Sequence, residues 1–186
     1  MSLTSAFYTK IEQQVDEILA QAGISVAPVN IQQVAKLKGV DVVSYELGDE
    51  VSGVLVVEQH RGIIGYNVNH PPRRQRFTIA HELGHYVLHV NKNKAQEMFV
   101  DKDFIVKWRY EKVYTPTEFK HEQEANAFAA AVLMPRSFLL HEMSKSKYDD
   151  LYETQLIEEL AKVFNVSIQA MTYRFADLNK FGLNRS

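Results

Sequence analysis

Hydrophobic and polar positions follow two different periods along the chain, which predict helices in its outer parts and strands between them. Apolar residues recur at helical spacing from Phe7 to Leu19, and a second short helix is expected between Pro28 and Gly39. Three β-type segments follow, at residues 40–47, 51–58 and 62–69. Because the links between them are short and polar, the pattern predicts a three-stranded antiparallel meander.

A continuous helical pattern over residues 72–89 contains the motif His81-Glu82-Leu83-Gly84-His85. Residues four apart on a helix differ by about 40° around its axis and about 6 Å along it, so both histidines can bind one ion. Catalytic zinc needs three protein ligands and an open position for water. Glu82 lies on an adjacent face and suits the general base that takes the proton of this water. The alternative is a helix with two half-buried histidines bonded to backbone.

The third ligand is expected from a second helix, over residues 117–134. His89 lies about 12 Å along the axis from His81, too far to share its ion, so packing or a hydrogen bond is its expected role. The second helix is rich in alanine, which suits close packing on the first. Gly84 also indicates that something approaches the first helix closely, since glycine costs roughly 1 kcal/mol inside a helix.

Four residues of this second helix are candidates for the metal site. Glu122 and Asn126 are four apart and share one face, which suits a carboxylate ligand beside an amide that orients a histidine. Glu124 points about 200° away from Glu122, so only one of the two faces the metal. His121 is a rival ligand nearer the edge of this face. The alternative for Glu122 is an ordinary solvated carboxylate.

Composition is that of a globular protein, with 46% apolar and 11% aromatic residues among 186. A net charge of −2 gives no general attraction to nucleic acid or an anionic membrane, and the lack of cysteine excludes thiolate metal sites. The N-terminus does not resemble a secretory signal, and no run approaches the roughly 20 apolar residues of a membrane span. The expected location is the cytoplasm.

Two segments, residues 76–89 and 122–135, resemble the ImmA/IrrE family of metallo-endopeptidases. The resemblance implies that His81, His85 and Glu122 hold the metal and that Glu82 is catalytic. It also implies that the substrate is a helix-turn-helix transcriptional repressor or antitoxin of a mobile element, prophage or stress-response system. Zn²⁺ is the expected metal, and another divalent ion such as Mn²⁺ would also fit.

The expected fold is therefore α+β and zincin-like, in two regions. Residues 1–136 form the peptidase core, in which the small three-stranded antiparallel sheet packs on the motif helix and on the second ligand helix. Residues 137–186 form a helical region that resembles a helix-turn-helix and packs on the core. The segment at 62–69 is the expected edge strand and pairs with an extended substrate, unless it is only structural.

The helix-turn-helix pattern raises a second class of function, a DNA-binding or protein-binding regulator with a structural zinc site. The presumed reading helix starts at Ser167 and offers four polar side chains, Gln169, Thr172, Tyr173 and Arg174. The preceding helix carries three glutamates, so phosphate contacts are scarce and direct nucleic-acid binding is not expected. The intact Glu82 argues against a non-catalytic module.

Two features of the expected active site stay open. The donor that stabilises the oxyanion is one of three residues, Tyr66, Tyr173 or Arg174, among which the sequence does not choose. The long connector at residues 91–116, with aromatic residues such as Trp108, is either a lid over the substrate cleft or a strand or helix of its own.

Overall fold

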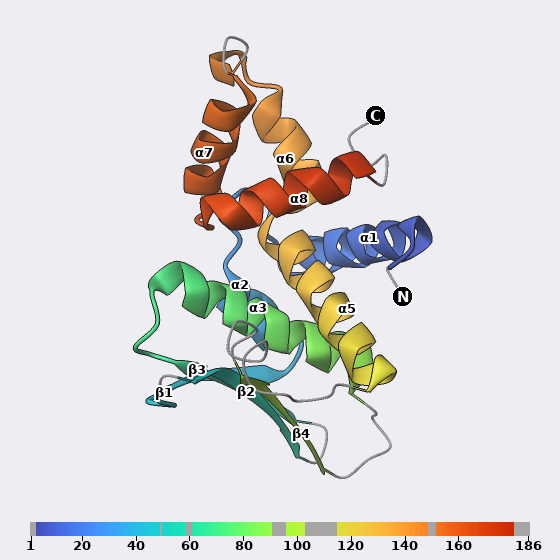
Figure 1. The fold of residues 1–186 in the computed structure, drawn as a ribbon, viewed down its shortest axis with the longest axis vertical. Coiled ribbons are helices and arrows are strands. Elements are labelled where there is room, and N and C mark those ends of the chain that lie inside the picture. Colours follow the sequence, from blue (N-terminus) through green and yellow to red (C-terminus); the bar gives the residue numbers. More distant parts are fainter. Residues whose placement is uncertain are drawn as a thin grey trace. The chain divides into compact units, whose positions relative to one another are not determined.

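The computed structural model describes residues 3–48, 50–58, 61–90, 96–102, 115–148 and 152–180. Its elements are α1 (Ser5–Gln21), α2 (Ile31–Leu37), β1 (Val40–Tyr45), β2 (Val51–Glu58), β3 (Arg61–Asn67), α3 (Pro72–His89), β4 (Gln96–Lys102), α5 (Pro116–Leu133), α6 (Arg136–Met143), a 3-10 turn η1 (Ser146–Tyr148), α7 (Glu153–Val163) and α8 (Ile168–Lys180) (Figure 1). The α+β class predicted from the sequence is confirmed. No helix in these ranges is long and apolar enough to span a membrane.

The chain divides into two compact units. Residues 31–129 form the first unit, with the sheet, α2, α3 and most of α5. The second unit contains α1 and the helices that follow α5. The boundary predicted after residue 136 places α1 in the peptidase core, whereas its contacts group it with the C-terminal helices.

The sheet has four strands in the order β1-β3-β2-β4, so the predicted three-stranded antiparallel meander is wrong. Strands β2 and β3 form the expected antiparallel pair, but β1 pairs with β3 in parallel. The fourth strand, β4, pairs antiparallel with β2. It comes from the connector that was expected to form either a lid or an element of its own; Trp108 of that connector lies outside the described residues.

Asn67, at the end of β3, explains why the short link after β1 does not form a hairpin. Its side-chain amide donates hydrogen bonds to the carbonyl oxygens of Gly48 (2.6 Å) and Val51 (3.0 Å). The link therefore crosses the end of β3, which lies between β1 and β2. The prediction that residues 62–69 form the edge strand is wrong, because β3 is paired on both sides.

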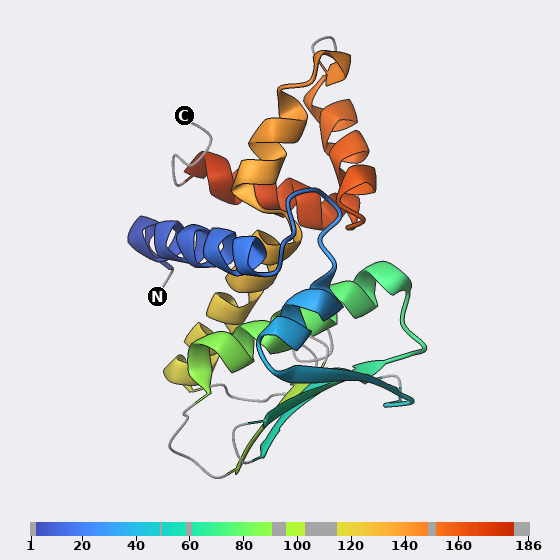
Figure 2. The ribbon, with the colours of Figure 1, turned by 180° about the vertical axis from the view of Figure 1, so that it is seen from behind.

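Helix α3 lies against one face of the sheet, where it contacts β2 and β3 (Figures 1 and 2). Its residues are buried in an unbroken run from Thr78 to His85. The sequence predicted one apolar face, but α3 is covered on more than one side, because α5 also packs on it at Gly84. The motif thus lies in the interior of the unit, where polar side chains need partners.

The second unit is held together by a buried ion pair as well as by apolar packing. Arg174 of α8 is 2% exposed, and its Nη2 lies 2.7 Å from Oε1 of Glu12 in α1. Its Nε–H also donates to the carbonyl oxygen of Met134. Between α7 and α8 the chain turns at Asn165, whose φ of 52° lies in the left-handed region that asparagine tolerates.

Candidate metal centre

The two histidines of the motif point to one place beside α3. His81 and His85 are each 3% exposed, and their Nε2 atoms lie 3.1 Å apart. Their rings are nearly perpendicular, with an interplanar angle of 79°. The in-plane lone pairs of the two rings therefore converge from different directions, as two ligands of one ion must.

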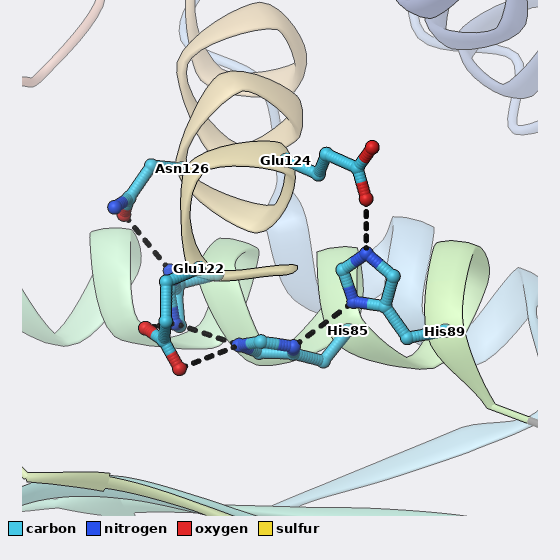
Figure 3. Close-up of polar contacts among 6 residues, drawn as sticks. His85, His89, Glu122, Glu124 and Asn126 are labelled. Carbon is cyan, nitrogen blue, oxygen red and sulfur yellow. Dashed lines mark hydrogen bonds and ion pairs between the residues drawn. The ribbon is translucent and has the colours of Figure 1, made fainter. Parts of the chain in front are cut away.

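Glu122 completes the cluster from α5 (Figure 3). Its two carboxylate oxygens lie 3.5 Å from Nε2 of His81 and 3.6 Å from Nε2 of His85. Two ligands that each lie about 2.0–2.1 Å from a tetrahedral ion are about 3.3 Å from each other. The spacing of the three side chains therefore fits a single zinc ion. The structure brings together the three residues that the sequence proposed as ligands.

Gly84 allows α5 to come close enough to supply this third side chain. A Cβ atom at Gly84 would lie 3.0 Å from the carbonyl oxygen of Ala125, 3.1 Å from its Cα and 3.2 Å from Cδ1 of Phe128. Two of these three atoms belong to the α5 backbone, which cannot move aside as a side chain tip can. The close approach expected from the glycine and from the alanine-rich helix is confirmed.

Gly84→Ala is expected to destabilise the metal-free protein by about 1 kcal/mol, because overpacking costs about 1–3 kcal/mol and exceeds the roughly 1 kcal/mol gained in helix propensity. Urea denaturation measures this loss. Arg73→Ala, an exposed change on the same helix, is the control and should have little effect. A Gly84→Ala protein as stable as the parent would show that the contact with α5 is loose.

Asn126 fixes the proton on one of the two histidines. Its side-chain oxygen lies 2.9 Å from Nδ1 of His81. Since an amide oxygen only accepts, Nδ1 carries the proton, and Nε2 is left with a free lone pair directed to the cluster. Asn126 thus has the contact that the sequence proposed for it.

His85 is held in the neutral state that a metal ligand requires. Burial, reinforced by the neighbouring His81, lowers its pKa from 6.5 to about 3. Glu122 opposes this shift but does not outweigh it. At neutral pH the ring therefore keeps a lone pair available for a cation.

The metal-free protein is expected to lose stability as the pH falls from about 6.5 towards 3. In this window the unfolded chain takes up a proton at His85 that the folded protein does not, so the free energy of unfolding decreases. Denaturation at a series of pH values measures the slope. His85→Leu should flatten it, whereas His141→Leu, at an exposed position of α6, should leave it unchanged. Equal slopes in all three proteins would contradict the assignment.

Glu82, the proposed general base, is fully buried beside the sheet. A Cβ atom at Gly53 of β2 would lie 3.4 Å from Cγ of Glu82 and would overlap Cγ2 of Thr78. Gly53 therefore provides the room that these two side chains occupy. Gly53 was not among the residues predicted from the sequence, although a glycine inside a strand is a signal that indicates close approach of another group.

The remaining predicted residues lie in different parts of the molecule. Tyr66 is half-buried on β3, in the same unit as the histidines. Tyr173 is 64% exposed on α8. Arg174 is engaged by Glu12, which gives it a structural role in the second unit. The role of each residue at the oxyanion stays a prediction.

A second group of side chains lies next to the cluster. His89 Nδ1 lies 3.1 Å from Nδ1 of His85, and its Nε2 lies 3.0 Å from Oε2 of Glu124 (Figure 3). His121, the rival ligand, stacks on the ring of His89 with centroids 4.1 Å apart. His89 thus makes the kind of hydrogen bond that the sequence suggested, and Glu124 is its partner.

Taken together, an α+β fold of the zincin type and a cluster of two histidines and one glutamate define a metallopeptidase-like class of protein. The chain belongs to the Peptidase M78 family, the family of the IrrE N-terminal-like domain, whose model matches residues 35–176. This confirms the family that the two motifs indicated. The match includes both helices that carry the cluster of His81, His85 and Glu122.

Comparison with solved structures shows the same type of fold elsewhere. A Mycobacterium tuberculosis transcriptional regulator is similar, with a TM-score of 0.58 and 17% sequence identity. The similarity covers 89% of this chain and 46% of that chain, so this protein spans less than half the length of the regulator. No curated protein matches the sequence significantly.

Proposed function

We propose that the protein is a zinc-dependent endopeptidase of the cytoplasm that cleaves a helix-turn-helix transcriptional repressor or antitoxin. The observation that carries the enzymatic part is the meeting of His81, His85 and Glu122 from two helices, next to the buried Glu82. Membership of a peptidase family supports a protein substrate. The repressor as substrate, and its origin in a mobile-element, prophage or stress-response system, rest on the resemblance to ImmA/IrrE proteins.

In this mechanism His81, His85 and Glu122 hold the zinc ion, and Asn126 keeps His81 in the tautomer that presents Nε2. A zinc ion held by these three residues would supply Lewis-acid chemistry for a water molecule and for the scissile carbonyl. Glu82 accepts a proton from the attacking water and passes it to the leaving amine. Its burial in the first unit suits this role, because proton transfer is then shielded from bulk solvent.

The oxyanion that forms on the substrate needs a hydrogen-bond donor. Among the three candidates, Tyr66 is in the same compact unit as the ligands and Glu82, and we include it as the proposed donor. Tyr66→Phe, which removes only the hydroxyl, is the variant that tests it. Tyr173 and Arg174 remain alternatives.

Incubation with the repressor encoded beside the gene is the experiment that tests this function. The purified protein should convert the repressor into two fragments, identified by mass spectrometry, and a chelator should prevent the reaction. Zinc added in excess of the chelator should restore it. An intact repressor under all conditions would contradict the proposed substrate, and cleavage unaffected by chelator would contradict the metal mechanism.

The DNA-binding alternative receives less support from the structure. Arg174 of the presumed reading helix is buried against Glu12 and is not available to a phosphate, which leaves Lys180, in the last turn of α8, as the basic residue of this helix. The exposed residues of that helix include Gln169, Thr172 and Tyr173, which are uncharged. Duplex binding measured across salt concentrations separates the two classes, since tight and strongly salt-dependent binding would favour the regulator.

A further inference from the structure

The hydrogen bonds around the two proposed histidine ligands are not equivalent. Nδ1 of His81 is hydrogen-bonded to the side-chain oxygen of Asn126, a neutral amide. Nδ1 of His85 instead contacts Nδ1 of His89, and Nε2 of His89 contacts the carboxylate of Glu124. His85 is therefore linked through His89 to a negative charge. We call His89 and Glu124 the orienting pair. Neither residue is a proposed ligand of the metal or a participant in the peptidase reaction.

The protons in this chain of contacts can be assigned from its outer end. A carboxylate only accepts, so Nε2 of His89 carries a proton and donates it to Glu124. Its other nitrogen, Nδ1, lies 3.1 Å from Nδ1 of His85, so one of these two nitrogens donates and the other accepts. His85 needs an unprotonated Nε2 to bind the proposed ion, so its own proton is on Nδ1. Nε2 of His85 then keeps its lone pair.

This assignment leaves two lone pairs that face each other. Nε2 of His81 and Nε2 of His85 lie 3.1 Å apart, and neither carries a proton. The oxygens of Glu122 add negative charge 3.5–3.6 Å away. Such an arrangement is repulsive by itself and is relieved by a cation placed among the three groups.

We propose that His89 and Glu124 are positioning residues that fix the tautomer and ring orientation of His85 and so raise the affinity of the site for zinc. The inference rests on the metal site of the proposed function and extends it to residues that do not touch the metal. Glu124 is itself held on its other side, since its Oε1 lies 3.6 Å from Nζ of Lys120. The side chains of His89 and Glu124 are largely buried, at 4% and 13% exposed.

A second metal ion is the competing explanation, because His89, His121 and Glu124 also bring ligand atoms close together. The rings of His89 and His121 are stacked with an interplanar angle of only 15°. Their lone pairs lie in nearly parallel planes and do not converge on one point. Both nitrogens of His89 are also engaged already, one by His85 and the other by Glu124.

The test compares zinc affinity in two variants of His89. His89→Phe preserves a flat ring against His121 but removes both nitrogens. It should weaken zinc binding about 10- to 100-fold, the usual loss when a residue that hydrogen-bonds to a metal ligand is removed. His89→Asn places an acceptor oxygen where Nδ1 was, and should recover part of the affinity. Competition with a chromophoric chelator gives the dissociation constants, and thermal unfolding of each metal-free protein shows that it is folded.

Glu124→Gln tests the charge at the end of the chain. It should weaken zinc binding less than His89→Phe, because an acceptor oxygen remains for Nε2 of His89. The matched controls are His141→Phe on α6 and Glu158→Gln on α7, both at exposed positions, and both should bind zinc as the parent does. Long-range ¹H–¹⁵N NMR of the zinc-loaded protein should show His85 protonated at Nδ1 and His89 protonated at Nε2 only.

Three results would overturn the inference: unchanged zinc affinity in folded His89→Phe, the opposite tautomer of His89, or two zinc ions per chain with one lost in His89→Phe. The same measurements distinguish an error in the proposed peptidase function from an error in the role of the orienting pair. If zinc binds and the orienting pair matters but no substrate is cleaved, only the function is wrong. If cleavage requires zinc but the variants bind it normally, only the orienting role is wrong.

Discussion

Glu82→Gln is expected to abolish peptide cleavage while zinc binding is retained. Glutamine has the shape of glutamate but cannot take the proton of the attacking water, and general acid–base catalysis accounts for about 10²–10⁴ in rate. Glu82 is not one of the ligands in the proposed coordination, so the affinity for zinc should be unchanged. Initial rates on the repressor and zinc titration of the same preparation measure the two effects.

The control for this variant is Glu118→Gln, near the start of α5, which changes the same group at an exposed position. It should leave both rate and affinity close to those of the parent protein. Retained turnover in purified Glu82→Gln would contradict its role as general base. Loss of zinc together with activity would show instead that Glu82 belongs to the metal site.

Glu122→Gln is expected to weaken zinc binding far more than Glu124→Gln, although the two residues are two apart on the same helix. Glu122 is a proposed ligand, whereas Glu124 reaches the site only through His89. Loss of an outer partner costs about 10–100-fold in affinity, and loss of a ligand should exceed this range. Zinc titration by chelator competition, with both variants shown to be folded, measures the difference.

His85→Ala is the companion variant on α3 and should lose the metal and the activity together. It removes a second proposed ligand, which leaves His81 and Glu122 without the geometry of a catalytic zinc site. Equal zinc affinity in Glu122→Gln and Glu124→Gln would contradict the ligand assignment. Stronger loss in Glu124→Gln would move the metal to the neighbouring group around His89.

The hairpin of β2 and β3 could be predicted because it depends on local spacing, but the position of β1 could not. Alternating side chains and a short link are common to a hairpin and to a link that crosses the end of another strand. What decides between them here is Asn67, which is far along the chain from Gly48 and bonds to its carbonyl oxygen. A contact between residues this far apart cannot be predicted from the sequence of the link alone.

The hydrophobic pattern of the sequence also did not predict the fourth strand or the place of α1 in the second unit. Strand β4 comes from a segment of mixed aromatic and charged residues, and it forms where β2 offers an unpaired edge. Helix α1 carries the usual apolar stripe, which fits any complementary surface. In the second unit its Glu12 pairs with Arg174 of α8, which is separated from it by most of the chain.

The sequence by itself determined the helix that presents His81 and His85, because the spacing of four residues fixes their common direction wherever that helix packs. It also narrowed the third ligand to the face of α5 that carries Glu122 and Asn126. Only the tertiary structure decided that this face meets the histidines, since close approach at Gly84 depends on how two separate helices pack. The tertiary structure likewise decided the strand order and the His89–Glu124 pair, because both depend on contacts between residues distant in the chain.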